Sequence, residues 1–262
     1  MTLNLSPSEI GKFVSAYRAL DFIESDMKLG LGTGSTAAWL VKLLAHEVNE
    51  NGLQIKACAT SSETTKLAER LGIKISKLDE LGQLDLAIDG ADEFDKNLNL
   101  IKGGGAALLQ EKIVETAADK LIIITDASKQ VEDLGSFDLP VEVVKFGWKT
   151  TKRLIENILE DEDVDCRVVN RRGNSSPIIT DEGHYILDLK LIRIGNPHSL
   201  SNALLNIAGV VETGLFLGMT NSIIMGDSTG KASVKSGINS DWVHSLNNIQ
   251  ELSEFIKKIN IL

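Results

Sequence analysis

Asp89-Gly90-Ala91-Asp92-Glu93, followed closely by Lys102-Gly103-Gly104-Gly105-Ala106-Ala107-Leu108-Leu109-Gln110-Glu111, is the stretch from which the fold is predicted. The apolar residues from Leu84 to Asp89 predict a short buried strand that ends in an acid, and Ala106 to Ala118 predict a helix entered through three glycines. Both elements then carry their polar groups toward the same end of a sheet. In open α/β sheets, ligands bind at that end.

The first half of the chain alternates apolar runs of strand length with amphipathic segments. This order is typical of a parallel sheet covered by helices on both faces, a Rossmann-like α/β fold. The expected strands are 27–31, 54–59, 84–89 and 120–125, and the expected helices are 9–23, 36–48, 63–71 and 106–118.

The pattern changes after Leu134, where the expected order is close to β-α-β-β-α-β, the arrangement of a ferredoxin-like unit. Its expected strands are 141–144, 165–169, 178–180, 185–189 and 210–217, and its expected helices are 150–159 and 199–207. Ser222 to Met225 is apolar enough to return to the first sheet, and Glu251 to Ile259 predicts a closing helix. We therefore expect an α/β catalytic domain, residues 1–135 and 210–262, with a smaller ferredoxin-like α+β domain inserted at 136–209.

Composition narrows the class of protein. With 262 residues and 43% hydrophobic side chains, the chain is long enough for a substantial core. Its 27 basic and 37 acidic residues give a formal net charge of -10, which disfavours nucleic acid and anionic membranes as partners. The first residues lack a signal-peptide pattern and no apolar run approaches about 20 residues, so we expect a soluble cytoplasmic protein. Cys58 and Cys166 form no Cys-x-x-Cys pair, which argues against a disulfide framework or a zinc site and predicts two small core residues in strands.

A glycine-rich loop, Gly30-Leu31-Gly32-Thr33-Gly34-Ser35-Thr36, follows a predicted strand and opens a predicted helix. Glycines let backbone N–H groups approach a ligand and a helix N-terminus attracts anions, so we interpret the loop as a phosphate-binding site. NAD binding is disfavoured because Thr60-Ser61, rather than an acid, follows the next strand. A nucleotide P-loop would need Gly-Lys-Ser/Thr, which the loop lacks. A plain strand-to-helix turn remains an alternative.

The acidic segment that begins at Asp89 also invites a metal-binding interpretation, because its side chains are oxygen donors. The spacing differs from that of a calcium loop, which has acids at alternate positions and a distant Glu. A solvated surface loop is the other alternative. The four acids of the segment are Asp89, Asp92, Glu93 and Asp95.

Lys102 and Glu111 flank the three successive glycines. On a 3.6-residue period Glu111 lies to one side of the apolar stripe of the predicted helix, so we expect it to border a cleft. The residues expected in that stripe are Leu109, Ile113, Val114 and Ala117.

Taken together, these segments resemble the ribose-5-phosphate isomerase A family. The motifs that carry the resemblance are Gly32-Thr33-Gly34-Ser35-Thr36-Ala37, Asp89-Gly90-Ala91-Asp92-Glu93, Lys102-Gly103-Gly104-Gly105-Ala106-Ala107, Glu111-Lys112 and Asp126-Ala127-Ser128-Lys129. Val143 to Trp148 and Gly209 to Phe216 extend it through most of the chain.

The resemblance implies an aldose-ketose isomerase that interconverts ribose 5-phosphate and ribulose 5-phosphate through an enediolate, in the non-oxidative pentose phosphate pathway. It implies no metal or organic cofactor, a small-molecule sugar phosphate as partner, and a homodimer or homotetramer. Glu111 is implied as the base that moves a proton between C1 and C2, Asp89 and Lys102 as groups that act on the sugar oxygens, and Asp92 as a supporting carboxylate. The implied substrate-binding residues are Lys12, Gly32, Thr33, Gly34, Ser35, Thr36, Gly90, Ala91, Gly103, Gly104, Gly105 and Lys129.

The residue types suit this chemistry independently. Removing a proton next to a carbonyl gives an enediolate, which requires a carboxylate base and a positive group near the oxygen that becomes negative. Glu111 and Lys102 supply that pair, and Asp89 at a strand end suits exchange with hydroxyl oxygens and opening of the furanose ring. With several carboxylates and a dianionic substrate close together, we expect at least one carboxyl pKa to be raised.

Some features depart from the family or favour other classes. The segment after Gly226 is longer than the family pattern, which leaves the oligomer contacts open. Arg171-Arg172-Gly173-Asn174 is either a solvated turn or a substrate contact. A sugar-phosphate sensor would not require Glu111 and would normally carry a DNA-binding segment. An amino-sugar phosphate deaminase would be expected to use a histidine, and none of His46, His184, His198 and His244 lies in a motif.

Overall fold

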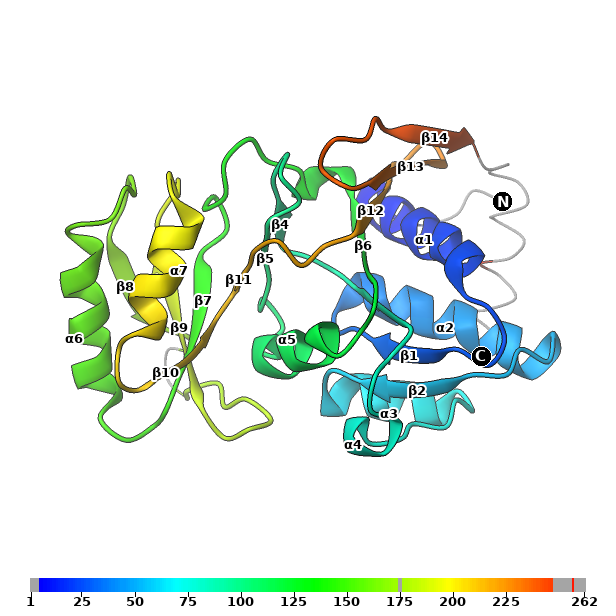
Figure 1. Cartoon of the computed structure of the whole chain (residues 1–262), viewed down its shortest axis with the longest axis horizontal. Coiled ribbons are helices and arrows are strands. Elements are labelled where there is room, and N and C mark those ends of the chain that lie inside the picture. Colours follow the sequence, from blue (N-terminus) through cyan, green and yellow to red (C-terminus); the bar gives the residue numbers. More distant parts are fainter. Residues whose placement is uncertain (1–4, 174–175, 247–255, 257–262) are drawn as a thin grey trace. The chain divides into compact units, whose positions relative to one another are not determined.

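The computed structural model describes residues 5–173, 176–246 and 256. The chain forms two compact units (Figure 1). Unit 1 contains the chain up to Gly90, Ile113–Lys129 and the residues from Thr220 onward, and unit 2 contains Ala91–Lys112 and Gln130–Met219. The predicted helix from Glu251 to Ile259 lies outside the described residues apart from Ile256. The domain bounds expected from the sequence stay a prediction.

Unit 1 is built on a seven-stranded sheet with the strand order β14-β13-β12-β6-β3-β1-β2. The five strands from β12 to β2 are parallel, and β13 and β14 extend the sheet in antiparallel fashion. This arrangement confirms the predicted α/β class. The strands are β1 (Lys28–Leu31), β2 (Lys56–Ala59), β3 (Leu86–Asp89), β6 (Leu121–Asp126), β12 (Ser222–Gly226), β13 (Lys231–Ser236) and β14 (Val243–Leu246).

Two helices of unit 1, α1 and α3, begin at serines that cap them. Ser6 accepts the N–H of Glu9 and Pro7 occupies the first turn of α1, while Ser61 accepts the N–H of Thr64 at the start of α3. The helices are α1 (Pro7–Ala19), the 3-10 turn η1 (Leu20–Phe22), α2 (Ser35–Glu50), α3 (Ser62–Arg70), α4 (Leu78–Leu81) and the 3-10 turn η2 (Ala127–Lys129). Helix α5 (Leu108–Thr116) begins in unit 2 and ends in unit 1.

The core of unit 1 forms where α1 and α2 pack on the sheet. Phe13, Leu40 and Leu44 are fully buried there together with strand residues such as Leu31 and Ile124. Their burial from both helices and strands is the packing that the alternating sequence predicts. Among the described residues, the helices are all too short or too polar to cross a membrane.

Unit 2 carries a four-stranded antiparallel sheet with the order β10-β7-β9-β8 and a small three-stranded sheet with the order β11-β5-β4. Along the chain, the larger sheet and its helices follow the predicted β-α-β-β-α-β order. The elements are β7 (Leu139–Val143), α6 (Trp148–Leu159), β8 (Val168–Arg171), β9 (Tyr185–Lys190), α7 (Pro197–Leu205) and β10 (Val210–Thr213). The small sheet consists of β4 (Glu93–Phe94), β5 (Leu100–Ile101) and β11 (Leu215–Phe216).

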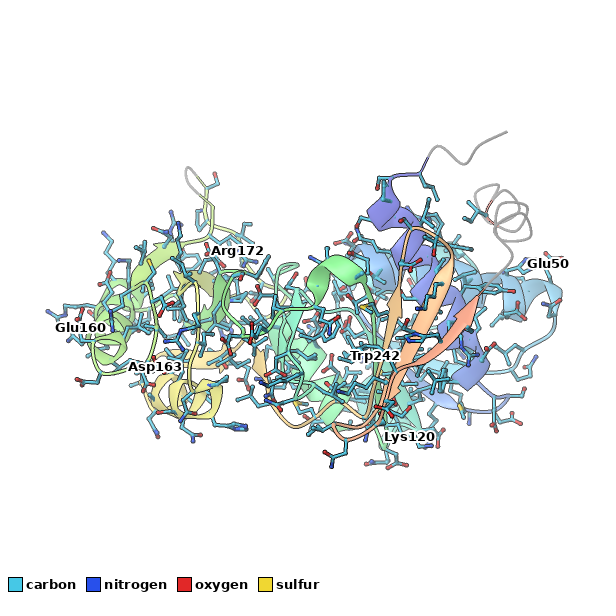
Figure 2. The ribbon with its side chains drawn as sticks, turned by 90° about the horizontal axis from the view of Figure 1, so that it is seen from above. Glu50, Lys120, Glu160, Asp163, Arg172 and Trp242 are labelled. Carbon is cyan, nitrogen blue, oxygen red and sulfur yellow. The ribbon has the colours of Figure 1, made fainter. Side chains whose placement is uncertain are left out.

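The second core fills unit 2. Ile155 and Leu159 of α6 pack with Val141 and Leu187 of the sheet, and all four are fully buried. Glu160, which follows α6, is exposed to solvent, and so is Glu50 at the end of α2 in unit 1 (Figure 2). Unit 2 therefore has a hydrophobic core of its own.

Three local predictions were wrong. The expected strand at 178–180 is reduced to a single bridge between Ile179 and Tyr185. The expected strand from Val210 to Leu217 is broken at Gly214, where a side chain would lie 2.3 Å from the carbonyl oxygen of Lys102. Cys58 is buried in β2 as expected, but Cys166 precedes β8 and is half-buried.

Candidate active site

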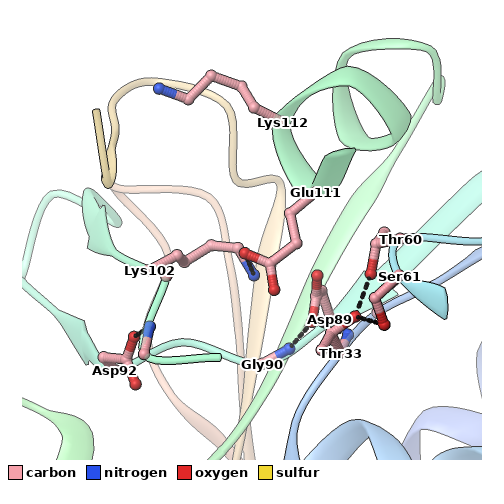
Figure 3. Close-up of polar contacts among 12 residues, drawn as sticks. Thr33, Thr60, Ser61, Asp89, Gly90, Asp92, Lys102, Glu111 and Lys112 are labelled. Carbon is pink, nitrogen blue, oxygen red and sulfur yellow. Dashed lines mark hydrogen bonds and ion pairs between the residues drawn. The ribbon is translucent and has the colours of Figure 1, made fainter. Parts of the chain in front are cut away.

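Asp89, the last residue of β3, organises the glycine-rich loop of unit 1. Its Oδ1 accepts the N–H of Thr33 at 3.0 Å and the N–H of Gly90 at 2.6 Å (Figure 3). A side chain at Gly32 would lie 2.0 Å from the same oxygen, so only glycine fits there. The carboxylate and the loop therefore hold each other in place.

The hydroxyl of Thr33 anchors the loop to the following strand end. It donates to Ser61 Oγ at 2.8 Å and lies 2.7 Å from Thr60 Oγ1, and both partners follow β2 (Figure 3). Thr64 donates its own hydroxyl to the carbonyl oxygen of Gly32 at 2.9 Å. Thr60 and Ser61, which fail to match a dinucleotide site, thus have a structural role beside the loop.

Helix α2 begins directly after this loop. Gly34 is its N-cap with a φ of 106°, and among the described residues no side chain caps the first turn. Ser35 is exposed and Thr36 is half-buried, so the N–H groups and hydroxyls at the positive end of a 16-residue helix remain accessible to an anion. The geometry suits the predicted phosphate site.

Lys102 and Glu111 form a buried ion pair in unit 2. Lys102 Nζ lies 3.6 Å from Glu111 Oε2, and the two side chains are only 2% and 5% exposed. Figure 3 shows the ammonium and the carboxylate pointing toward each other, Lys102 from the end of β5 and Glu111 from the first turn of α5. The Lys102 ammonium also lies 5.4 Å from the centre of the Phe216 ring. A carboxylate and a cation are thus held together in a water-poor environment.

The face that α5 buries differs from the prediction. The helix starts at Leu108 and buries Leu108, Glu111, Val114 and Glu115, whereas Ile113 is exposed. Glu111 therefore lies on the buried face and not beside it, because that face carries two acids, Glu111 and Glu115, next to apolar residues, which an apolar pattern alone does not indicate.

The loop between Lys102 and α5 is held by Asp92. Asp92 Oδ2 accepts the N–H of Gly104 at 2.7 Å (Figure 3). Gly103 has a φ of +107°, and a side chain at Gly104 would lie 2.6 Å from the Asp92 carboxylate. Asp92 thus holds the loop between the buried cation and the helix of Glu111.

The remaining acids of the Asp89–Asp95 segment accept N–H groups from turns. Glu93 accepts the N–H groups of Gly135 and Phe137, and Asp95 accepts those of Asn97 and Asn99. Asp89, Glu93 and Asp95 are all buried, so the solvated-loop alternative was wrong. Within the described ranges, no three His, Cys, Asp or Glu side chains are grouped so that they could hold a metal ion.

Lys12 and Lys129 lie on neighbouring elements of unit 1. Lys12 in α1 bonds Glu9 at 2.7 Å, and Ser8 of the same helix donates to Asp126 at 3.1 Å, next to the turn that carries Lys129. Burial alone would raise the pKa of Glu9, but hydrogen bonds from Lys12 and Trp39 outweigh it and lower that pKa.

The predicted site residues thus fall into two groups by unit. Unit 1 holds Lys12, Gly32, Thr33, Gly34, Ser35, Thr36, Asp89, Gly90 and Lys129, and unit 2 holds Ala91, Asp92, Lys102, Gly103, Gly104, Gly105 and Glu111. The chain passes from the first group to the second between Gly90 and Ala91.

Comparison with known proteins identifies the family. Residues 56–230 match the family model of ribose 5-phosphate isomerase A, also called phosphoriboisomerase A. The chain belongs to the ribose-5-phosphate isomerase A family. The ribose-5-phosphate isomerase A of Cereibacter sphaeroides is 54% identical over 236 residues, covering 90% of this chain and 94% of that relative. The protein of the same name from Dinoroseobacter shibae is 52% identical over 245 residues, covering 93% and 94%.

Solved structures of ribose-5-phosphate isomerases share the fold of this family member. The Methanocaldococcus jannaschii enzyme superimposes with a TM-score of 0.78 at 34% identity, covering 86% of this chain and 97% of that one. A D-ribose-5-phosphate isomerase in complex with phospho-erythronic acid gives a TM-score of 0.81 at 37% identity, covering 88% and 100%. The family and the fold therefore agree over most of the chain.

Sequence reasoning missed two polar groups of this isomerase-family chain, Lys112 and Glu142. Lys112 donates to Glu212 Oε1 at 2.7 Å and to the carbonyl oxygens of Thr213 and Leu215, both at 2.9 Å. Its ammonium lies 4.5 Å from the centre of the Phe216 ring, so the ring has one lysine at 4.5 Å and Lys102 at 5.4 Å. These partners lie about a hundred residues away in the sequence, where no local pattern could indicate them.

Glu142 of β7 is another missed group. It is buried, and its Oε1 lies 2.9 Å from His184 Nδ1 and accepts the hydroxyl of Thr180 at 2.9 Å. Burial raises the pKa of its carboxyl even though both partners act to lower it. Arg172, for which the sequence left a solvated turn or a substrate contact open, has the carboxylate of Asp188 and the glycine loop after Lys102 as partners.

Proposed function

We propose that this protein interconverts ribose 5-phosphate and ribulose 5-phosphate, with Glu111 as the base and Lys102 as the cation that stabilises the enediolate. The observation that carries this proposal is the buried Glu111–Lys102 pair, 3.6 Å apart, inside the segment that matches the family. In support, a solved family member is bound to phospho-erythronic acid, a phosphorylated sugar acid.

In the proposed reaction Glu111 takes the proton from C2 of the open-chain aldose. The electron pair of that C–H bond forms the C1–C2 double bond, and the carbonyl electrons move to O1. The Lys102 ammonium stabilises the resulting negative charge because both groups are nearly excluded from water. Glu111 then returns its proton to C1, while O2 loses its proton and O1 gains one, so the ketose forms with no change in overall oxidation state.

The other predicted residues keep their roles as parts of this proposal. Asp89 exchanges protons with the sugar oxygens during ring opening, and Asp92 supports the loop after Lys102. The start of α2, with Ser35 and Thr36, receives the phosphate, since no side chain in the described part of the chain caps that turn. Lys12 and Lys129 add positive charge for the dianionic substrate.

We propose that the protein acts in the cytoplasm, in the non-oxidative pentose phosphate pathway, as a homodimer or homotetramer that needs no metal or organic cofactor. Light scattering of the purified chain would measure the subunit number. Activity that falls after chelation and returns with a divalent ion would contradict the metal-free part of the proposal.

The deciding experiment is turnover of ribose 5-phosphate in heavy water. Proton transfer through a carboxylate predicts deuterium at C1 of the ribulose 5-phosphate formed, and at C2 of the ribose 5-phosphate formed in the reverse reaction. Product that contains no deuterium would instead support direct hydride transfer or fully shielded proton transfer. Absence of any turnover would reject the proposed function.

Glu111→Gln tests the assignment of the base. We expect kcat to fall by about 10² to 10⁴ with little change in substrate binding, because the amide cannot accept the proton. Glu115→Gln, one turn further along the same helix and also buried, is the matched control and should keep turnover close to that of the unsubstituted protein. Equal losses in both variants would remove Glu111 as the base.

A further inference from the structure

Arg172 contacts the glycine loop that joins Lys102 to α5. Its Nη1 donates to the carbonyl oxygens of Gly103 at 2.8 Å and Gly104 at 3.0 Å. Arg172 directly follows β8 in unit 2 and is labelled in Figure 2. A guanidinium group thus bridges two successive carbonyl groups of a loop that has no side chains of its own.

Asp188 of β9 orients this guanidinium. Arg172 Nε donates to Asp188 Oδ2 at 2.8 Å and to Oδ1 at 3.1 Å, and Nη2 also donates to Oδ1. Asp188 pairs with Asn170 in the β8–β9 ladder, so the acceptor lies on a rigid sheet. Two N–H groups face this carboxylate and two face the loop, which engages four of the five N–H groups of the arginine.

The same loop is held from other directions as well. Gly104 donates its N–H to Asp92 at 2.7 Å, and Lys102 donates its N–H to the carbonyl oxygen of Gly214 at 2.9 Å. Glycines lose more conformational entropy on ordering than other residues, so a loop of three glycines needs such contacts to stay in one conformation. Arg172 binds the carbonyl groups of Gly103 and Gly104, and the Gly103 carbonyl also accepts the N–H of Ala106 at 3.0 Å.

We propose that Arg172 is a positioning residue of the isomerase: by fixing Gly103 and Gly104 it sets the distance between Lys102 and Glu111. Both charged side chains flank this loop, and their 3.6 Å separation depends on its conformation. The inference rests on the proposed function, since it assigns Arg172 to the pair that performs the proton transfer. Arg172 acts through that pair and not by contact with the substrate.

Arg172→Gln is the first test, with Arg171→Gln as its matched control. Arg171 is the neighbouring arginine, but its guanidinium lies over the rings of Trp148 at 5.3 Å and Tyr185 at 5.8 Å. We expect kcat to fall about 10- to 100-fold in Arg172→Gln, because sub-ångström misplacement of reacting groups is costly, and to stay near the unsubstituted value in Arg171→Gln. An unchanged kcat in Arg172→Gln, or equal losses in the two variants, would overturn the inference.

A double-mutant cycle separates positioning from other roles. If Arg172 acts through Lys102, then adding Arg172→Gln to Lys102→Met should reduce kcat much less than it does in the unsubstituted protein. Losses that multiply in the double variant would show that Arg172 acts independently of Lys102, and the inference would fail. The thermal midpoint of each variant is measured beside kcat.

Chemical rescue tests whether the lost kcat comes from the missing guanidinium group and not from a weakened fold. Millimolar guanidinium ion added to Arg172→Ala should restore part of the lost kcat, whereas the same concentration of sodium chloride or urea should not. Arg172→Lys should remain impaired because lysine keeps the charge but lacks the planar fork. No rescue by guanidinium, or full activity with lysine, would count against positioning. If the unsubstituted protein itself fails to convert ribose 5-phosphate, the proposed function fails instead.

Discussion

The two glycine-rich loops of this protein use different backbone groups. The loop of unit 1 leads to the N–H groups at the start of a helix, whereas the loop of unit 2 uses its carbonyl groups to bind an arginine. The loop of unit 1, Gly30 to Thr36, leads directly into α2 and leaves the N-terminus of that helix uncapped by side chains of the described residues. In the loop of unit 2, Gly103 to Gly105, Arg172 binds the carbonyl groups of Gly103 and Gly104, and Asp92 accepts the N–H of Gly104.

The difference shows why glycine content alone does not identify a phosphate site. In the first loop glycine allows a carboxylate to approach the backbone, because a side chain at Gly32 would overlap Asp89, and the following helix offers N–H groups to a ligand. In the second loop the backbone groups are bound by the protein itself, and its chemistry lies in Lys102 and Glu111 at its two sides. Glycine serves binding in one loop and positioning in the other.

Replacing Lys102 and Lys112, the two lysines near Phe216, one at a time by methionine should give the largest difference in kcat. Lys102→Met removes the cation beside Glu111, and we expect kcat to fall about 10² to 10³-fold. Lys112→Met removes contacts to Glu212, to two carbonyl groups and to the Phe216 ring, so it should lower the free energy of unfolding by about 1–3 kcal/mol and leave the kcat of the folded protein nearly unchanged. Steady-state kinetics and urea denaturation separate the two effects, and similar kcat losses would mean that the chemistry does not depend on Lys102 beside the second loop.

Alanine substitution of one glycine in each loop should have an intermediate effect. The added carbon of Gly32→Ala would lie 2.6 Å from the Cα of Asp89, so the backbone must shift and the free energy of unfolding should fall by about 3 kcal/mol. The three atoms nearest to the carbon of Gly104→Ala all belong to the Asp92 carboxylate, which can rotate, so the cost should be about 1 kcal/mol. Chemical denaturation measures both. An equal cost would mean that the first loop is as adaptable as the second.

Substitution of Asp126 should have the smallest effect on the free energy of unfolding, and that effect should depend on pH. Asp126 ends β6, the neighbour of β3, and accepts the N–H of Ser128 at 2.9 Å much as Asp89 accepts the N–H of Thr33. Burial alone would raise the pKa of the Asp126 carboxyl, but hydrogen bonds from Ser128 and Ser8 and the charge of Lys129 outweigh it and lower that pKa.

The sign of the effect follows from this lowered pKa. The ionised carboxylate stabilises the folded state at pH values above the ordinary carboxyl pKa of about 4, and the contribution disappears as the pH falls through the lowered pKa. Asp126→Asn should therefore cost about 1 kcal/mol at neutral pH and progressively less in acid. Urea denaturation across this range measures the difference, with the exposed Asp79→Asn as control. A cost that is constant with pH would mean that the carboxylate charge contributes nothing.

Sequence reasoning succeeded where structure is encoded locally. The alternation of apolar strands and amphipathic helices predicted β1, α2, β2, α3, β3 and β6 with bounds close to those observed, because each hydrophobic run has a single way to be buried. The pairing of Lys102 with Glu111 followed from the chemistry that a proton transfer requires and from the resemblance of the motifs. In unit 1, strands β13 and β14 were not predicted, although Lys231 to Ser236 alternates polar residues with Ala232 and Val234, the pattern of a strand with one buried face.

The failures concern contacts between residues far apart in the sequence. The break at Gly214 is imposed by the carbonyl group of Lys102, and the role of Arg172 depends on carbonyl groups that precede it by about seventy residues. Two-residue strands such as β5 and β11 carry too little pattern to be recognised from their own sequence. Long-range hydrogen bonds to backbone groups leave no trace in the sequence around either partner.

The pairing of β5 with β11 has a consequence for synthesis of the protein on the ribosome. Leu100 and Ile101 pair with Phe216 and Leu215, and the N–H of Lys102 bonds the carbonyl group of Gly214. A nascent chain that ends before these later residues has Lys102 and Glu111 but lacks the strand that seats the lysine. The ammonium can therefore reach its final place only after most of the chain has left the exit tunnel, and shorter translation products carry the motif without its geometry.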